Sequence, residues 1–483
     1  MTFRETYGEL RRQRAAVAED SGVAEEVVQH IWHELAFATD NLVTDDGRAL
    51  RIVSPGWWNH AEGPDFRGAQ LEFNGRLRDG DVEVHLTHAA WKQHGHDGDP
   101  RFDRVRLIAV LEKRPPRQPP HTSSGRRIPC LLLGNLLKED IDSLADRLPL
   151  YREPAQSPAA HGACAALTRR FGTDNMNELV RLAGEWRMVQ KAQLLRERMA
   201  YVGPEQAIYE ALLRACGYSR YKHQFRVTAE QLPYERARQL AKQDTHLLEA
   251  AYLQLTGLMP ESLNEEAAGF AHFSRLEALR QKHLPGLRSI PLEWSRLKTR
   301  PINYPERRMA GMARFIARTA AEGLLATLDR IWTEPHSPTA RRKALEALFP
   351  GRMGFWANHC TWSGKPLRSP IAPIGKGRVR SMIGNVFVPA AIALARERGE
   401  RTLEEKALAF FARLPQEPGN RVVTRMLPRI YGENAHPKLD FRMQQGLLQL
   451  FGDWCESNPS CRNCPVLLHL GGPDGSSTEG YTS

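Results

Sequence analysis

Apolar residues recur at two different spacings along the chain, and each spacing predicts a different kind of element. From Val23 to Phe37 they fall every three to four positions, which predicts a helix. Short runs of aliphatic and β-branched residues follow, separated by Pro-Gly, Asn-Gly and Asp-Gly turns, and these runs predict strands. The predicted strands cover residues 50–53, 69–73, 81–85, 105–111 and 128–133, with a Pro-rich loop at 113–124. The first part of the chain is therefore expected to be an α/β domain with a small sheet.

The helical spacing returns at about Asn175 and predicts an all-α region. Helices are expected at 176–201, 204–216 and 307–328, with breaks at Gly217, Pro233, Pro260 and Pro285. The expected fold class is therefore α/β plus all-α, in a multidomain chain. The expected divisions are an α/β domain at 1–150, a helical domain at 160–350, a helical C-terminal domain with a cysteine cluster at 351–470 and a disordered tail at 471–483.

Composition narrows the class of protein. The chain has 483 residues, of which 41% are hydrophobic and 25% charged, as in soluble globular proteins. Uninterrupted apolar stretches stay well short of ~18 residues, so no membrane-spanning helix is expected. The first twenty residues are charged throughout and lack the apolar core of a signal peptide. We therefore expect a cytoplasmic protein with no membrane partner.

The charge balance favours a polyanionic partner. Lys and Arg number 67 against 56 Asp and Glu, which gives a net charge of +11. A positive field of this kind attracts nucleic acid, although many enzymes are equally basic without binding DNA. Basic residues gather at 101–130 and 365–380, and in the second stretch Lys376, Arg378 and Arg380 are the expected phosphate contacts.

Two acids and a histidine form the most informative pattern. Asp65 follows a Gly-Pro turn, and Glu83 and His85 lie in a predicted strand, where alternate side chains share one face. If the strands on either side of the Asn74-Gly75 turn pair, Asp65 approaches the same point. Carboxylates on neighbouring strands can hold Mg²⁺ or Mn²⁺, and a third group can position a water for phosphodiester hydrolysis.

This order of residues, Pro64-Asp65 followed by Glu83-x-His85, is similar to the core of PD-(D/E)xK nucleases, with His in place of the usual Lys. The resemblance implies a restriction-endonuclease-like mixed sheet and a Mg²⁺-dependent nuclease. The chain also resembles a bacterial family designated domain of unknown function 2851. That resemblance rests on Trp32, Asn59, Gly63-Pro-Asp-Phe66, Gly80-Asp-Val-Glu-Val-His85, Trp91, His94, His96, Arg300-Pro-Ile-Asn-Tyr-Pro305 and the terminal cysteines.

The Lys-to-His change leaves alternatives open. A neutral His, with an unperturbed pKa of about 6.5, can still act as a general base, so we expect Asp65 and Glu83 as metal ligands and His85 as the base. The competing interpretation is a non-catalytic nucleic-acid-binding or assembly protein that keeps the nuclease fold. A third is a zinc-dependent hydrolase that uses His94 and His96. In the first interpretation these two histidines contact the substrate. Glu34 on the first helix could approach the metal, although a surface position on an amphipathic helix is the favoured expectation for it.

The C-terminal cysteines predict a second metal site. Cys455, Cys461 and Cys464 lie at close spacing, and the Cys-x2-Cys pair is typical of chelation in a reduced protein. His469 would complete a Cys₃His zinc site, whereas a distant thiol such as Cys360 would complete either a zinc site or an iron–sulfur cluster. Zinc with His469 is the favoured expectation.

Overall fold

The computed structural model describes most of the chain, and the ranges that it describes are 7–10, 25–59, 62–111, 119–137, 164–290, 292, 294–296, 299–334, 337–417, 419–432, 437–455, 461 and 464–471. The chain divides into two compact units. The first comprises Met1–Leu182, Val422–Pro437 and Leu447–Ser483, and the second comprises Ala183–Arg421 and Lys438–Gly446. The C-terminal cysteines therefore group with the N-terminal part, whereas the sequence suggested a separate domain at 351–470.

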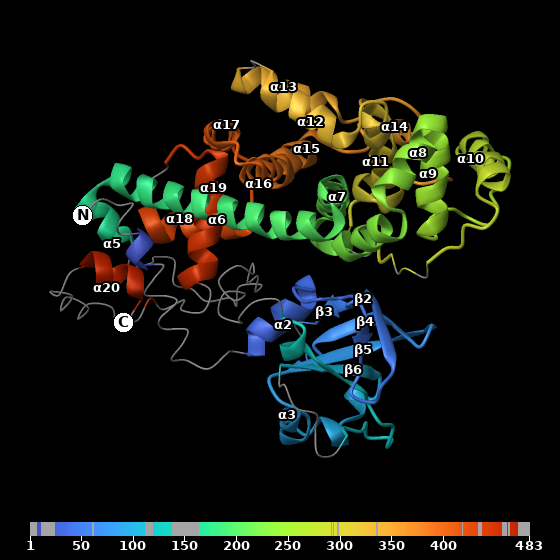
Figure 1. Ribbon diagram of the computed structural model, residues 1–483, viewed down its shortest axis with the longest axis horizontal. Helices are drawn as coiled ribbons and strands as arrows, with labels where there is room; N and C mark the ends of the chain where they lie inside the picture. Colours follow the sequence, from blue (N-terminus) through green and yellow to red (C-terminus); the bar gives the residue numbers. More distant parts are fainter. Residues whose placement is uncertain are drawn as a thin grey trace. The chain divides into compact units, whose positions relative to one another are not determined.

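A mixed sheet forms the first part of the first unit (Figure 1). In the described residues it has seven strands: β1 (Leu42–Val43), β2 (Ala49–Ser54), β3 (Trp57–Trp58), β4 (Phe66–Phe73), β5 (Arg76–His85), β6 (Val105–Val110) and β7 (Cys130–Leu132). Their order is β1-β2-β4-β5-β6-β7, and β3 pairs with β4. Pairing is antiparallel from β1 to β5 and parallel from β5 to β7. The predicted α/β character of this region is confirmed.

The hairpin between β4 and β5 sets the register of the central strands. Phe73 pairs with Arg76, so the turn consists of Asn74 and Gly75 alone. Both have positive φ, 47° and 78°, as a two-residue type I′ turn requires. The pairing across this turn, expected from the Asn-Gly signal, is confirmed.

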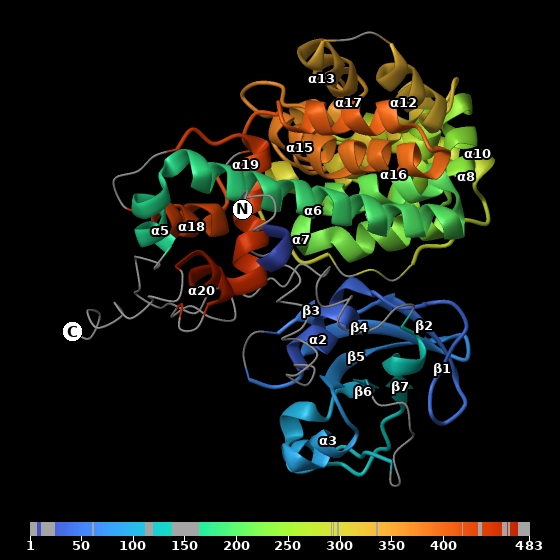
Figure 2. The ribbon, with the colours of Figure 1, turned by 60° about the vertical axis from the view of Figure 1, so that its left-hand side comes forward.

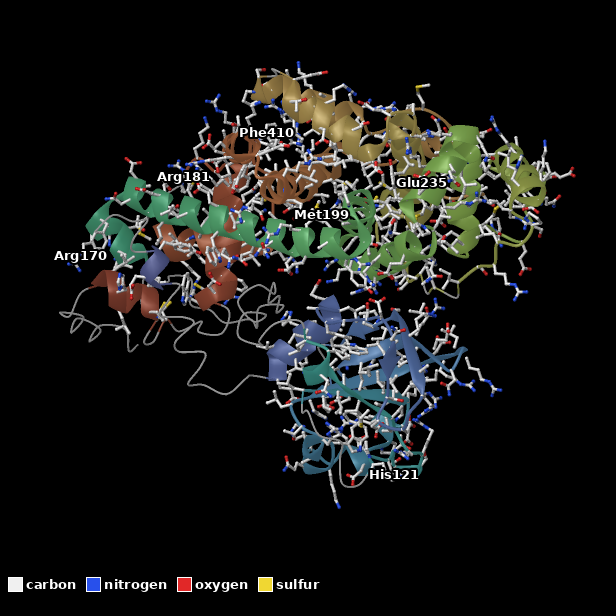
Figure 3. The ribbon with its side chains drawn as sticks, in the orientation of Figure 1. His121, Arg170, Arg181, Met199, Glu235 and Phe410 are labelled. Atoms are coloured by element: carbon white, nitrogen blue, oxygen red, sulfur yellow. The ribbon has the colours of Figure 1, made fainter. Side chains whose placement is uncertain are left out.

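Helix α2 (Glu25–Glu34) lies within the helix predicted at 23–37 and packs on one face of the sheet. Its Val28, Ile31 and Trp32 are fully buried against residues of β4, β5 and β6. Between β5 and β6 the chain forms α3 (Ala89–Gln93), η1 (His96–Gly98) and η2 (Pro100–Phe102). This segment contributes Trp91 and Phe102 to a second apolar cluster. Figure 3 shows His121 in the same region, where its carbonyl accepts a hydrogen bond from Trp91 Nε1 at 3.0 Å.

The remainder is helical, as predicted. The first unit also holds α5 (Cys164–Phe171), α18 (Arg421–Tyr431), the π-helix η6 (Phe451–Cys455) and α20 (Pro465–Gly471). Two helices, α6 (Thr173–Val202) and α19 (Phe441–Leu450), run through the boundary between the units.

Helices build the described part of the second unit, where α11 packs on α8 and α9 (Figure 1) and α16 packs on α17 (Figure 2). They are α7 (Pro204–Gln231), α8 (Tyr234–Gln243), α9 (Thr245–Leu255), α10 (Phe270–His283), η4 (Pro301–Asn303), α11 (Pro305–Thr319), α12 (Leu324–Thr333), α13 (Pro338–Ala347), α14 (Phe355–Asn358), α15 (Lys376–Met382), the π-helix η5 (Ile383–Phe387), α16 (Val388–Arg398) and α17 (Arg401–Phe411).

One predicted break is wrong. Helix α7 continues through Gly217 to Gln231, because a glycine inside a helix costs only about 1 kcal/mol and packing can outweigh that cost. A Cβ at this position would lie 2.8 Å from the backbone nitrogen of Lys222, five residues along the same helix, so the missing side chain relieves a local contact within α7. Pro233, in contrast, does mark a boundary, since it caps α8.

The stretch Lys376–Arg398 is the one described helix that is long and apolar enough to cross a membrane by length and composition. Its most apolar window is 78% buried inside the structure, which is typical of the core helix of a globular domain.

Candidate functional site

Asp65 and Glu83 are held against each other by the pairing of β4 and β5. Asp65 directly precedes β4, and its backbone N–H donates to Glu83 Oε2 at 2.9 Å. In return the Val84 N–H donates to Asp65 Oδ2 at 3.0 Å. Glu83 thus accepts a hydrogen bond from the Asp65 backbone, and Asp65 accepts one from the backbone of β5. The two expected metal ligands therefore lie side by side.

Burial changes the ionisation of both acids. Burial, together with the neighbouring Glu83 carboxylate, raises the pKa of Asp65 to about 7, against the opposing effects of its hydrogen bonds and of His85. Burial likewise raises the pKa of Glu83 to about 7, against the opposing effect of His85. Two carboxylates this close together disfavour double ionisation, and a divalent cation between them would remove that penalty.

His85 faces the same point as Glu83, as the strand alternation predicts. Its Nε2 lies 3.7 Å from Glu83 Oε1, and its Nδ1 lies 2.6 Å from Glu25 Oε1. The side chain is 1% exposed, and Nε2 is buried without a hydrogen-bond partner among the described residues. A histidine held by a carboxylate on one nitrogen, with the other nitrogen available, is the arrangement found at many metal sites and general bases.

His94 and His96 lie next to these residues, just after α3. His96 Nε2 is 3.2 Å from Glu83 Oε1, and burial lowers the pKa of this histidine. One ligand nitrogen from each of His85, His94 and His96 lies within 4.8 Å of the other two. We call Glu25, Asp65, Glu83, His85, His94 and His96 the acid–histidine site.

The sequence analysis missed two residues that support this site. Glu25 and Gln29 lie four positions apart on α2, and therefore on one helix face. Gln29 Nε2 donates to Asp65 Oδ1 at 2.9 Å. Burial raises the pKa of Glu25, but the hydrogen bond and the charge of His85 outweigh it, so the net shift is downward. Glu34, the helix acid that the sequence analysis proposed, instead contacts His33, with 3.5 Å between Oε1 and Nδ1.

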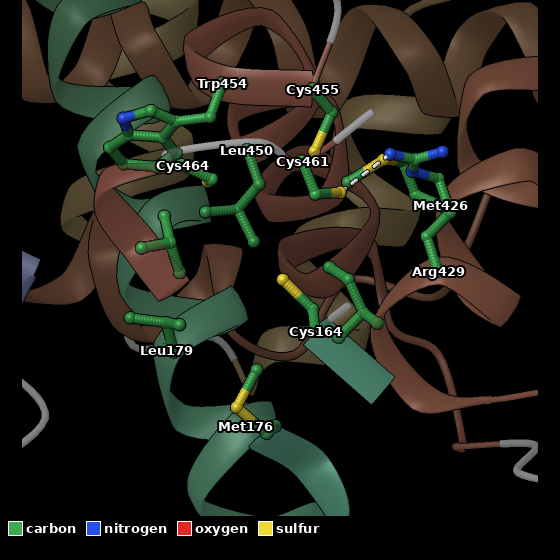
Figure 4. Close-up of a pocket in the computed structure, with 12 residues that line it drawn as sticks. Cys164, Met176, Leu179, Met426, Arg429, Leu450, Trp454, Cys455, Cys461 and Cys464 are labelled. Carbon is green, nitrogen blue, oxygen red and sulfur yellow. Dashed lines mark hydrogen bonds between the residues drawn. The ribbon is translucent and has the colours of Figure 1, made fainter. Parts of the chain in front are cut away.

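A cysteine pocket lies in the helical part of the first unit (Figure 4). Cys455, Cys461 and Cys464 line it together with a cysteine that the sequence analysis did not consider, Cys164. The residues that line this pocket do not include His469 or Cys360, the two fourth ligands that were expected. His469 belongs to the last turn of α20.

The expected phosphate contacts differ from one another in exposure. Lys376 and Arg380 are exposed on α15, whereas Arg378 is half-buried. Burial lowers the pKa of Arg378 to about 10. In the other basic stretch, Arg101 pairs with Asp99, and Arg126 donates to the carbonyls of Asp103 and Val105. Some of the Lys and Arg residues that give the chain its excess positive charge therefore bind other residues of the protein and stabilise the fold.

Comparison with known proteins gives one match. A family model described as a protein of unknown function (DUF2851) matches residues 25–420, which include the whole acid–histidine site. No curated protein and no solved structure matches the chain.

Proposed function

This chain belongs to the DUF2851 family of proteins of unknown function, and we propose that it is a metal-dependent nuclease that hydrolyses phosphodiester bonds in DNA or RNA. The observation that carries the proposal is the pair Asp65 and Glu83. Glu83 is buried and Asp65 is half-buried, both have a pKa raised to about 7, and His85 Nε2 and His96 Nε2 lie 3.7 and 3.2 Å from Glu83 Oε1. Perturbed acids gathered in this way are typical of functional sites.

The order of elements supports the proposal. In α2-β2-β4-β5-α3-β6, the first acid precedes β4 and the Glu-x-His pair ends β5, which is the order of elements and acids in the PD-(D/E)xK core. The parallel pairing of β5 with β6 across an intervening helix also agrees with that core. A restriction-endonuclease-like fold is therefore part of the proposal.

The ligand set favours one kind of cation. Asp65 and Glu83 offer oxygen, which suits Mg²⁺ and Mn²⁺, whereas the histidines offer nitrogen, which suits Zn²⁺ and other transition metals. Mn²⁺ accepts both, so we expect it to support more activity than Mg²⁺. When bound, such a cation polarises the phosphate and offsets the charge that develops on it.

His85 is assigned the role of base. The Glu25 carboxylate fixes the proton on Nδ1, so Nε2 carries the lone pair and faces Glu83. The water oxygen bonds to phosphorus while the bond to the leaving oxygen breaks. Nε2 accepts the proton of that water, and the leaving oxygen takes a proton from solvent. Glu83 and Asp65 hold the cation, and His94 and His96 contact the substrate phosphate.

A second candidate function, a zinc-dependent hydrolase, is favoured by the three histidines. Three nitrogens within 4.8 Å of one another match the three-ligand sets of catalytic zinc sites. In that case His85 is a ligand rather than a base, and activity follows Zn²⁺ rather than Mn²⁺.

The test is a cleavage assay with single- and double-stranded DNA and RNA, in the presence of Mn²⁺, Mg²⁺ or Zn²⁺. We expect cleavage with Mn²⁺, and a loss of roughly 10³-fold or more in D65N and E83Q, because either change removes a charged ligand. The matched control is E72Q, whose acid pairs with Arg51 on the exposed side of the neighbouring strand. Equal cleavage by wild type and E83Q would refute the proposal. Salt-sensitive binding without turnover would instead favour the non-catalytic interpretation.

A further inference from the structure

Four of the cysteines come together from separate parts of the sequence. Cys164 begins α5, Cys455 ends the π-helix η6, and Cys464 directly precedes α20. With Cys461 they line one cavity (Figure 4). The four thiols that line this cavity offer a complete four-sulfur ligand set.

The wall around the thiols is otherwise apolar and includes one cation. Its apolar members are Met176, Leu179, Met426, Ile430, Leu450, Trp454 and Val466. The cation is Arg429, whose Nη2 donates to Cys461 Sγ at 3.1 Å. Arg429 is only 3% exposed. A buried guanidinium that donates to sulfur favours thiolates, and metal-bound cysteines are thiolates.

Two kinds of metal centre use four thiolates. A single zinc ion binds all four at ~2.3 Å, whereas a cubane cluster bonds each thiolate to a different iron, so its ligands stand farther apart. Here the Cys-x2-Cys pair is joined by Cys164 and Cys455 from two other segments around one cavity, an arrangement that suits the larger centre.

We propose that Cys164, Cys455, Cys461 and Cys464 ligate one [4Fe–4S] cluster that joins the start of α5 to the C-terminal segment of the chain. Cys164, rather than His469 or Cys360, is the fourth ligand. Arg429 offsets the negative charge of the cluster through its hydrogen bond to Cys461. This proposal does not depend on the nuclease proposal, because the two sites share no residue.

The first test measures iron, acid-labile sulfide and zinc in the full chain purified without oxygen, together with its visible spectrum. We expect a brown protein with about four irons and four sulfides per chain. C164S should lose the iron, whereas C360S and H469A should keep it. A colourless protein with one zinc, a metal-free soluble protein or a C164S variant that keeps its iron would each overturn the proposal.

A second measurement needs no variant, and therefore remains decisive if C164S fails to fold. Wild-type protein is treated with iodoacetamide before and after removal of the metal by a chelator, and the labelled cysteines are identified by mass spectrometry. The four proposed ligands should react only after removal, whereas the half-buried Cys360 should react in both samples. Labelling of Cys164 in the untreated protein would contradict its role as a ligand.

Discussion

The acid–histidine site and the cysteine pocket are two sets of potential metal ligands with opposite construction. The first takes its six residues from Glu25 to His96, around two paired strands. The second joins Cys164 to residues far along the chain. The first also keeps His85 Nε2 without a hydrogen bond in the described residues and leaves the His96 side chain 14% exposed, whereas apolar side chains enclose much of the second. An open ligand set suits chemistry, and a closed one suits stability.

The largest expected effect tests the closed site. C461S should abolish metal binding, and the loss of even ~3 kcal/mol from such a centre lowers Tm by about 10 °C. Cleavage per folded molecule should change by less than about threefold, because the pocket contains no residue of the acid–histidine site. Calorimetry and an active-site-normalised cleavage assay measure the two quantities. A loss of cleavage at unchanged Tm would contradict this comparison, because it would assign the cysteine site to catalysis rather than to stability.

The open site should respond in the opposite way. H85A removes the proposed base and should slow cleavage by roughly 10²- to 10⁴-fold, with little change in metal content at the cysteines. The control is H121A, an exposed histidine of the same region. Single-turnover rates at saturating substrate give the measurement. If H85A lowers Tm as well as the cleavage rate, the slower cleavage reflects a structural role of His85.

A smaller effect is expected for the carboxylate behind His85. E25Q keeps the shape of the side chain but removes its charge, and changes of this kind beside a metal ligand or base typically cost 10–100-fold. We expect kcat to fall while KM stays constant. E34Q is the matched control, since that acid on the same helix contacts His33 instead. Equal effects of the two variants would contradict the assignment of Glu25.

The smallest effect concerns pH. The pKa values of Asp65 and Glu83 are raised to about 7, from ordinary values near 4. Their contribution to stability is therefore fully present below pH 4 and is lost as pH rises through 7. Cation-free protein should lose several °C of Tm between pH 5 and pH 8 from this pair, and Mn²⁺ should restore it at pH 8.

The control for this titration is E83Q, which removes one of the two interacting charges. Its Tm should vary less over the same pH range and should not respond to Mn²⁺, whereas E72Q should behave as wild type does. An unchanged pH dependence in E83Q would show that other groups titrate.

Local signals explain what the sequence could predict. The Asn74-Gly75 turn and the alternation in β5 suffice to bring Glu83 and His85 to one face and Asp65 beside them. The periodicity of α2 shows that Glu25 and Gln29 share a face, but it does not show which turn of the helix reaches the sheet. That depends on packing, so the sequence named Glu34 as a further acid and did not identify Glu25.

Distant pairings explain the rest. The Cys-x2-Cys pair identifies a site from spacing alone, yet nothing in the sequence around Cys164 links it to the C-terminus. Its position follows from the packing of α5, α18 and α20, which a single sequence does not encode in any local pattern. Gly217 failed as a helix break for a local reason: α7 continues through it, and its missing Cβ leaves room for the backbone of Lys222 in the same helix.

The hydrogen bonds that join Asp65 to Glu83 and to Val84 form only when β4 and β5 pair in the native register. The Asp65 N–H holds one carboxylate, and the Val84 N–H holds the other. A slip of one residue between β4 and β5 would turn Glu83 and His85 to the opposite face and break both bonds at once. A misaligned chain would therefore have no partial site and could not bind a cation or cleave a substrate wrongly. Activity would appear only in molecules whose strands have locked in the native register.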